Sequence, residues 1–223
     1  MSDNSFGGNG ADGKAKLVLL RGGGGDGAEY TLNATEHRAG REHGLILFPD
    51  DPTVSPSHAE FFYQDGRLRV RDLGSANGTY VRIRTPVELG GSDRFVCGEQ
   101  MFELRTVAEP PNPWVDDVCF TGSVVPDDLD FQLIQVLAGD RPGMVRGYGP
   151  TRVTIGREGC TLSFPNDRYM SHEHASVGRS GSTWTLEDSG SKNGTYVRIR
   201  ADVPLQDGDT LFIGKQLVRV DIA

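Results

Sequence analysis

A thirteen-residue block that occurs twice is the feature that most constrains this chain. Residues 72–84 and 188–200 are identical at eleven of thirteen positions, at a fixed offset of 116. An internal repeat of this quality indicates two copies of one structural unit. In each copy an Asn-Gly turn dipeptide precedes Thr-Tyr-Val, which is typical of a β-strand. The repeat therefore predicts two similar modules, each presenting a polar turn.

The match continues well outside the block, at the same offset. Gly-Arg at 40–41 matches 156–157, and Ser-x-x-His at 55–58 matches 171–174. These shared positions are mostly polar and fall on predicted loops, where binding residues commonly lie on a β scaffold. The pattern favours recognition of a ligand over the bare maintenance of a core.

The strand pattern predicts an all-β fold with two β-sandwich domains in tandem. Short apolar or alternating runs are separated by turn signals such as Asp65-Gly66, and no amphipathic helix is evident. The glycine-rich stretch 22–27 lacks the Gly-Lys-Ser/Thr of a phosphate-binding P-loop, so we expect a hairpin loop there. The expected boundaries are a disordered tail at 1–14, domain 1 at 15–107, an acidic Pro-containing linker at 108–129 and domain 2 at 130–223.

Charge and cysteine usage exclude several functional classes. Of the formal net charge of −8, −6 lies in residues 107–130, and no basic stripe typical of a nucleic-acid binder is present. No apolar run is long enough for a membrane helix, and no signal peptide is recognised. The three cysteines are far apart, which favours a reducing, cytoplasmic location. We expect neither a metal nor a cofactor.

Together, Gly-Arg, Ser-x-x-His and Asp-x-x-Ser-x-Asn-Gly-Thr resemble the forkhead-associated (FHA) domain, in both modules. The resemblance implies sandwiches of about eleven strands whose loops bind phosphothreonine peptides. It further implies a non-enzymatic adaptor or scaffold in Ser/Thr-kinase signalling, whose partner is a phosphothreonine-containing protein such as a kinase or its substrate. The alternative is a phosphorylation-independent interaction or oligomerisation scaffold, which would include self-association.

The resemblance also assigns residues to roles. Arg and Ser would hold the phosphate and Asn the peptide backbone, which suits an anion that carries about −1.5 to −2 charges and three acceptor oxygens. The expected phosphopeptide-binding residues are Arg157, Ser171, His172, Lys192, Asn193, Arg41, Ser55 and Asn77. The expected structural loop residues are Gly40, His58, Gly78, Thr79, Gly156, His174, Gly194 and Thr195.

The two sites are not expected to be equal. Domain 1 has Pro56 after its serine and Ala76 before its asparagine, where domain 2 has His172 and Lys192. Proline lacks a backbone donor, and alanine offers no polar side chain. We therefore expect domain 2 to be the stronger reader.

Overall fold

The computed structural model describes residues 15–21, 25–107, 114–115, 117–119, 121–123, 126, 128–181 and 183–223. The predicted tail at 1–14, residues 22–24 of the glycine-rich stretch and part of the linker lie outside these residues. The described part of the chain consists of strands and turns, with no helix, so it holds no helix that could cross a membrane. The prediction of an all-β fold is confirmed.

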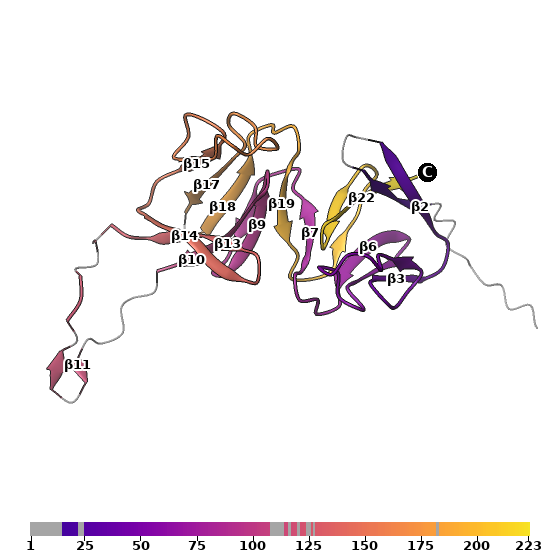
Figure 1. Ribbon diagram of the computed structural model, residues 1–223, viewed down its shortest axis with the longest axis horizontal. Coiled ribbons are helices and arrows are strands. Elements are labelled where there is room, and N and C mark those ends of the chain that lie inside the picture. The colour runs from indigo at the N-terminus through magenta and orange to yellow at the C-terminus, as the bar shows by residue number, and fades with distance from the viewer. Residues whose placement is uncertain are drawn as a thin grey trace, which may run out of the picture. The chain divides into compact units, whose positions relative to one another are not determined.

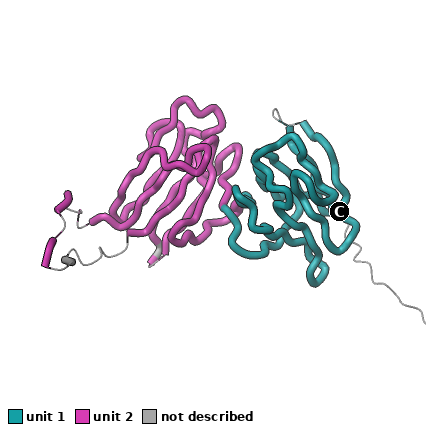
Figure 2. The backbone as a smooth tube through the Cα atoms, turned by 60° about the horizontal axis from the view of Figure 1, so that its bottom comes forward, with its two compact units in different colours: residues 1–82, 198–223 teal, residues 83–197 magenta. Residues whose placement is uncertain are grey.

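The chain folds into two compact units that cut across the boundaries expected from the repeat. Unit 1 runs to Arg82 and resumes from Arg198 to Ala223, whereas unit 2 is Ile83–Val197 (Figure 2). Unit 1 therefore combines most of the first repeat with the C-terminal strands of the second, and unit 2 combines most of the second repeat with the C-terminal strands of the first. The exchanged segments are equivalent, because both begin just after the Thr-Tyr-Val strand of their own repeat.

Unit 1 contains ten of the described strands in two sheets (Figure 1). They are β1 (Ala15–Leu20), β2 (Asp26–Leu32), β3 (Glu36–Gly40), β4 (Ile46–Leu47), β5 (Ala59–Gln64), β6 (Arg67–Asp72), β7 (Thr79–Arg82), β20 (Val203–Pro204), β21 (Thr210–Ile213) and β22 (Gln216–Ile222). One sheet has the order β7-β21-β22-β1-β2 and the other β20-β6-β5-β3-β4. A single cluster of buried apolar side chains, which includes Leu17, Phe61 and Val218, forms the core.

Unit 2 has the same plan, again with ten described strands. They are β8 (Val87–Leu89), β9 (Asp93–Cys97), β10 (Gln100–Thr106), β13 (Phe131–Leu137), β14 (Arg141–Tyr148), β15 (Val153–Gly156), β16 (Leu162–Ser163), β17 (Ala175–Ser180), β18 (Thr183–Asp188) and β19 (Thr195–Arg198). The sheet orders are β14-β13-β10-β9-β19 and β16-β15-β17-β18-β8. Its core cluster includes Phe95, Phe102, Phe131 and Val177. Within the linker, β11 (Trp114–Val115) pairs with β12 (Val118–Cys119).

Local chemistry explains the strands that carry the loops. In β6, Leu68 and Val70 are buried while their neighbours are more exposed, as the alternation in its sequence predicts. The turn that joins β5 to β6 places Asp65 and Gly66 at φ of 52° and 74°, which suits a two-residue hairpin turn. Strand β6 then ends at Asp72, where the Asn-Gly loop begins.

Candidate functional site

Three loops converge in each unit, and the backbone ties the first two together. In unit 2 the Arg157 N–H donates to the Ser171 carbonyl at 2.8 Å, and in unit 1 the Arg41 N–H donates to the Ser55 carbonyl at 2.9 Å. The glycine before each arginine permits this approach, because a Cβ at Gly156 would collide with the His172 carbonyl oxygen. A backbone hydrogen bond thus holds the expected phosphate-binding Arg and Ser side by side in each unit.

The serine hydroxyl links the second loop to the third. Ser171 Oγ accepts the Lys192 N–H at 3.1 Å, and Ser55 Oγ accepts the Ala76 N–H at 3.0 Å. Because the hydroxyl accepts in this contact, its own proton can be donated to an incoming anion.

The asparagine side chain makes a second link between the same loops. Asn193 Nδ2 donates to the Tyr169 carbonyl, and Asn77 Nδ2 donates to the Thr53 carbonyl, both at 2.7 Å. This fixes the orientation of an exposed amide whose Oδ1 can accept an N–H group. An amide held in this way suits an extended peptide backbone.

The histidines lie beneath the loops and not at their surface. His174 is fully buried; its Nδ1 accepts the Ser171 N–H at 3.1 Å, and its Nε2 lies 3.0 Å from the Gly194 carbonyl. His58 makes the equivalent contacts with Ser55 and Gly78. Accepting at Nδ1 and donating at Nε2 is the pattern of a neutral ring with its proton on Nε2. Burial lowers the pKa of His58, which favours that neutral form.

A half-buried carboxylate organises each Asn-Gly loop, and residue patterns alone did not assign it a role. Asp188 accepts the N–H groups of Gly190 and Ser191 and the hydroxyls of Ser191 and Thr195, at 2.6–3.0 Å. Asp72 makes the same contacts in unit 1. Burial alone would raise the pKa of Asp188, but these hydrogen bonds outweigh it and lower the pKa. The signal was available in the sequence, since the aspartate begins both copies of the block.

A second aspartate, this one buried, supports the serine loop. Asp167, 3% exposed, accepts the N–H groups of Tyr169 and Met170 and also that of Glu99 at 2.8 Å. In unit 1 the equivalent Asp51 accepts the N–H groups of Thr53 and Lys215. Each loop therefore rests on the hairpin supplied by the other repeat.

The remaining structural predictions fall at the same loops. Gly78 and Gly194 have φ of 82° and 83°, a left-handed conformation that glycine adopts without strain. Thr79 and Thr195 are fully buried and bound to the aspartates. Among the described residues, no group of three or more His, Cys, Asp or Glu side chains is placed to hold a metal ion.

The charged surroundings of the two sites differ. In unit 1, Arg41 Nη2 lies 2.9 Å from a carboxylate oxygen of Glu42, whereas Arg157 makes no ion pair with any described residue of unit 2. His172 and Lys192 are exposed beside Arg157's loop system, where unit 1 has Pro56 and Ala76. Unit 2 thus offers more unopposed positive charge.

Unit 2 also carries an arginine with no counterpart in unit 1. Arg168 Nη2 donates to Tyr169 Oη at 3.0 Å, and its guanidinium carbon lies 4.8 Å from the centre of that ring. Tyr169 is 40% exposed, and its carbonyl holds Asn193. The equivalent position of Arg168 in unit 1 is Pro52.

A family model for the FHA domain matches residues 37–98 and 153–214, which is more than half of the chain. The chain belongs to the FHA family. Both matches contain the Arg, Ser and Asn residues described above, so the prediction of a tandem FHA protein is confirmed.

Two relatives each match about a third of the chain. An oxoglutarate dehydrogenase inhibitor from Corynebacterium diphtheriae is 45% identical over 67 residues, covering 30% of this chain and 47% of that protein. The glycogen accumulation regulator GarA from Mycolicibacterium smegmatis is 45% identical over 76 residues, covering 34% and 47%. The chain spans about half the length of these relatives. An FHA domain structure from Chlamydia trachomatis is 12% identical with a TM-score of 0.37, covering 93% and 95%.

Proposed function

We propose that this tandem FHA protein is a non-enzymatic adaptor that binds phosphothreonine peptides in Ser/Thr-kinase signalling. The observation that carries the proposal is the repeated arrangement of Arg, Ser and Asn on three hydrogen-bonded loops. The expected partner is a phosphothreonine-containing protein, such as a kinase or its substrate.

The chemistry of the three groups supports this ligand. A guanidinium provides planar charged donors, and a hydroxyl adds a neutral donor. Hydrogen bonds to a charged group are each worth about 1.5–3 kcal/mol. After the costs of association, a few such bonds give about −7 to −8 kcal/mol, which corresponds to micromolar binding. Reversible binding in that range suits a reader of phosphorylation.

We further propose that unit 2 is the stronger reader. Three differences support this: the ion pair between Arg41 and Glu42, with which a phosphate must compete, the exposed Lys192 where unit 1 has Ala76, and Arg168. Arg168 contacts Tyr169, whose carbonyl holds Asn193. An exposed ion pair is worth about 0.2–1 kcal/mol, so releasing Arg41 changes affinity by at most about fivefold. Glu42→Ala should strengthen unit 1 by that amount and leave unit 2 unchanged.

The test is calorimetric titration of the full chain with a phosphothreonine peptide and its unphosphorylated form. Arg157→Ala and Arg41→Ala each leave one site intact and serve as matched controls for each other. We expect the larger loss of affinity from Arg157→Ala, with little change in melting temperature. Equal binding of the unphosphorylated peptide refutes the phosphate-dependent function and favours the phosphorylation-independent scaffold. An equal or reversed effect of the two substitutions refutes only the ranking.

A further inference from the structure

Strands β8–β10 of the first repeat complete unit 2, and strands β20–β22 of the second repeat complete unit 1. The two segments are equivalent at the 116-residue offset, so backbone hydrogen bonding alone does not choose between exchanged and sequential pairing. We propose that complementary charge and side-chain size direct each C-terminal segment to the unit begun by the other repeat, within one chain.

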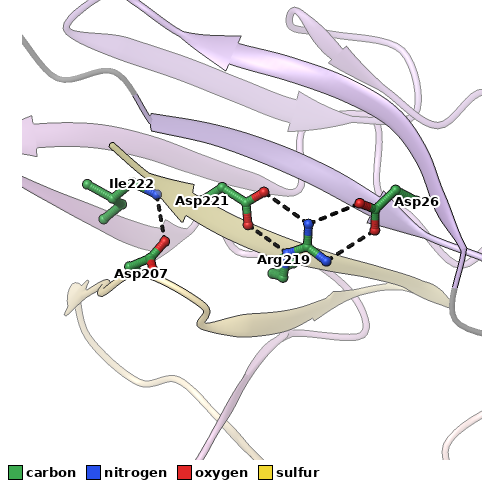
Figure 3. Close-up of polar contacts among 5 residues, drawn as sticks. All are labelled: Asp26, Asp207, Arg219, Asp221 and Ile222. Carbon is green, nitrogen blue, oxygen red and sulfur yellow. Dashed lines mark hydrogen bonds and ion pairs between the residues drawn. The ribbon is translucent and has the colours of Figure 1, made fainter.

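Charge complementarity is clearest where β22 enters unit 1 (Figure 3). Arg219 donates to both carboxylate oxygens of Asp26 at 3.1 and 3.2 Å, and to Asp221 at 2.6 and 3.0 Å. Lys16 of β1 lies directly opposite Asp221 in the strand register. The first repeat thus contributes Asp26 and Lys16, and the second contributes Arg219, which binds Asp26, and Asp221, which faces Lys16. Lys16 Nζ itself bonds Glu29 of the first repeat at 3.0 Å.

Sequential pairing in the same register would place like charges at both positions. Arg105, the equivalent of Asp221, would lie opposite Lys16, and Glu103, the equivalent of Arg219, would take the position facing Asp26. Like charges placed directly opposite on adjacent strands are destabilising.

Unit 2 has its own partner-dependent ion pair. Arg94 of β9 contacts Asp140, in the turn between β13 and β14, at 2.7 Å. The equivalent of Arg94 is Thr210, which carries no charge to offer Asp140. Within the β9–β10 hairpin, Glu103 forms ion pairs with Arg94 and Arg105, at 3.0 and 2.8 Å.

Side-chain sizes match in the same sense at the directly paired positions. Ala15 lies opposite Ile222 in unit 1, and Phe131 lies opposite Thr106 in unit 2. Each pair combines a small residue with a large one. Sequential pairing would set Ala15 opposite Thr106 and Phe131 opposite Ile222, because both pairs are equivalent at the offset.

The centres of the two cores follow the same rule. Phe61 of unit 1 shares a core with Leu211 and Val218 of the β21–β22 hairpin, which the second repeat supplies. At the equivalent positions of unit 2, the smaller Val177 shares a core with Phe95 and Phe102. Close-packed interiors penalise both voids and overpacking, so interchanging the hairpins would be unfavourable in both units.

One position favours the sequential pairing. Glu88 lies opposite Thr185, and Arg69 lies opposite Pro204, whereas sequential pairing would bring Glu88 opposite Arg69. This is a single exposed strand-edge pair, set against two charge reversals and a change in both cores.

The test measures which of two hairpins, β9–β10 or β21–β22, forms a disulfide with position 20 of β1. Leu20 pairs with Leu217, whose equivalent in the first repeat is Met101. Directly opposed residues in an antiparallel pair have Cα atoms about 4.5–5.5 Å apart, within disulfide range. The full chain with L20C, L217C and M101C, in a C119S/C160S background, is oxidised with glutathione disulfide. Mass spectrometry then identifies the linked peptides, and non-reducing electrophoresis separates links within a chain from links between chains.

We expect the link from position 20 to position 217 within one chain to predominate. A predominant link from 20 to 101, or a 20-to-217 link found only between chains, overturns exchange within one chain. The charge assignment is tested by adding E103R, R105D, R219E and D221R to the same chain. We expect this variant to shift the ratio of the two links toward position 101 by about tenfold, as two cross-strand charge pairs change sign. An unchanged ratio refutes charge as a determinant.

Discussion

Removal of the Asp188 carboxylate is the perturbation whose effect follows most directly from the geometry. Asp188 accepts four hydrogen bonds, two from backbone N–H groups and two from the hydroxyls of Ser191 and Thr195. Thr195 is fully buried and Ser191 is 6% exposed, so neither hydroxyl can readily turn to water. Asp188→Ala leaves these donors without their acceptor.

The magnitude follows from the cost of such groups. A hydrogen bond to a charged acceptor is worth about 1.5–3 kcal/mol, but bonds within one network do not add. We therefore expect Asp188→Ala to lower the free energy of unfolding of unit 2 by about 3 kcal/mol. Asp188→Asn keeps one acceptor oxygen and the side-chain shape, so about half that loss is expected.

Denaturant unfolding measures these losses. Trp184 is buried in unit 2, and in a Trp114→Phe background its fluorescence reports that unit alone. Glu158→Ala is the control, because Glu158 is an exposed carboxylate of unit 2 whose substitution should change stability by less than about 0.5 kcal/mol. A loss below about 1 kcal/mol for Asp188→Ala refutes the organising role.

The pH dependence gives an independent readout of the same carboxylate. Its pKa is lowered in the folded state, so its stabilisation is complete above the unfolded pKa of about 3.9 and is lost as the pH falls through the folded pKa. Below about pH 4, the free energy of unfolding of the wild type should therefore fall more steeply with decreasing pH than that of Asp188→Asn. Parallel acid profiles would contradict this.

Three further outcomes follow from the loops. Gly156→Ala places a Cβ against the His172 carbonyl and should weaken phosphopeptide binding by unit 2 at least about tenfold, measured by titration. An unchanged affinity would mean that the loops adjust freely. Burial lowers the pKa of His58, so its contribution to stability is complete above the unfolded pKa of about 6.5 and declines as the pH falls from there toward the folded pKa. His58→Gln should therefore flatten the dependence of stability on pH below about pH 6.5, and an unaltered slope contradicts this. Asn193→Ala removes the hydrogen bond to the Tyr169 carbonyl and should clearly weaken peptide binding in titrations, with only a small drop in the melting temperature. A large drop in melting temperature with little loss of affinity would make Asn193 mainly structural.

The sequence alone predicted the strands that carry the repeated loops, because their signals are local. Alternation and turn dipeptides depend on neighbouring residues, and they located β5, β6 and β7 to within about two residues. The edge strand β14 was not predicted, since Arg141–Tyr148 contains proline and two glycines and shows no alternation. Pairing with β13 makes it a strand.

The same contrast runs through the site and the units. Arg, Ser, His and Asn could be listed from a fixed spacing, because a repeat preserves loop chemistry as well as core. The roles of Asp188 and Asp167 could not, since both depend on which donors the fold brings within hydrogen-bond distance. Which strands make up each unit could not be predicted from local sequence either. Two equivalent hairpins fit the same place in the backbone, so the packing and charge of residues distant in sequence decide which unit each hairpin completes.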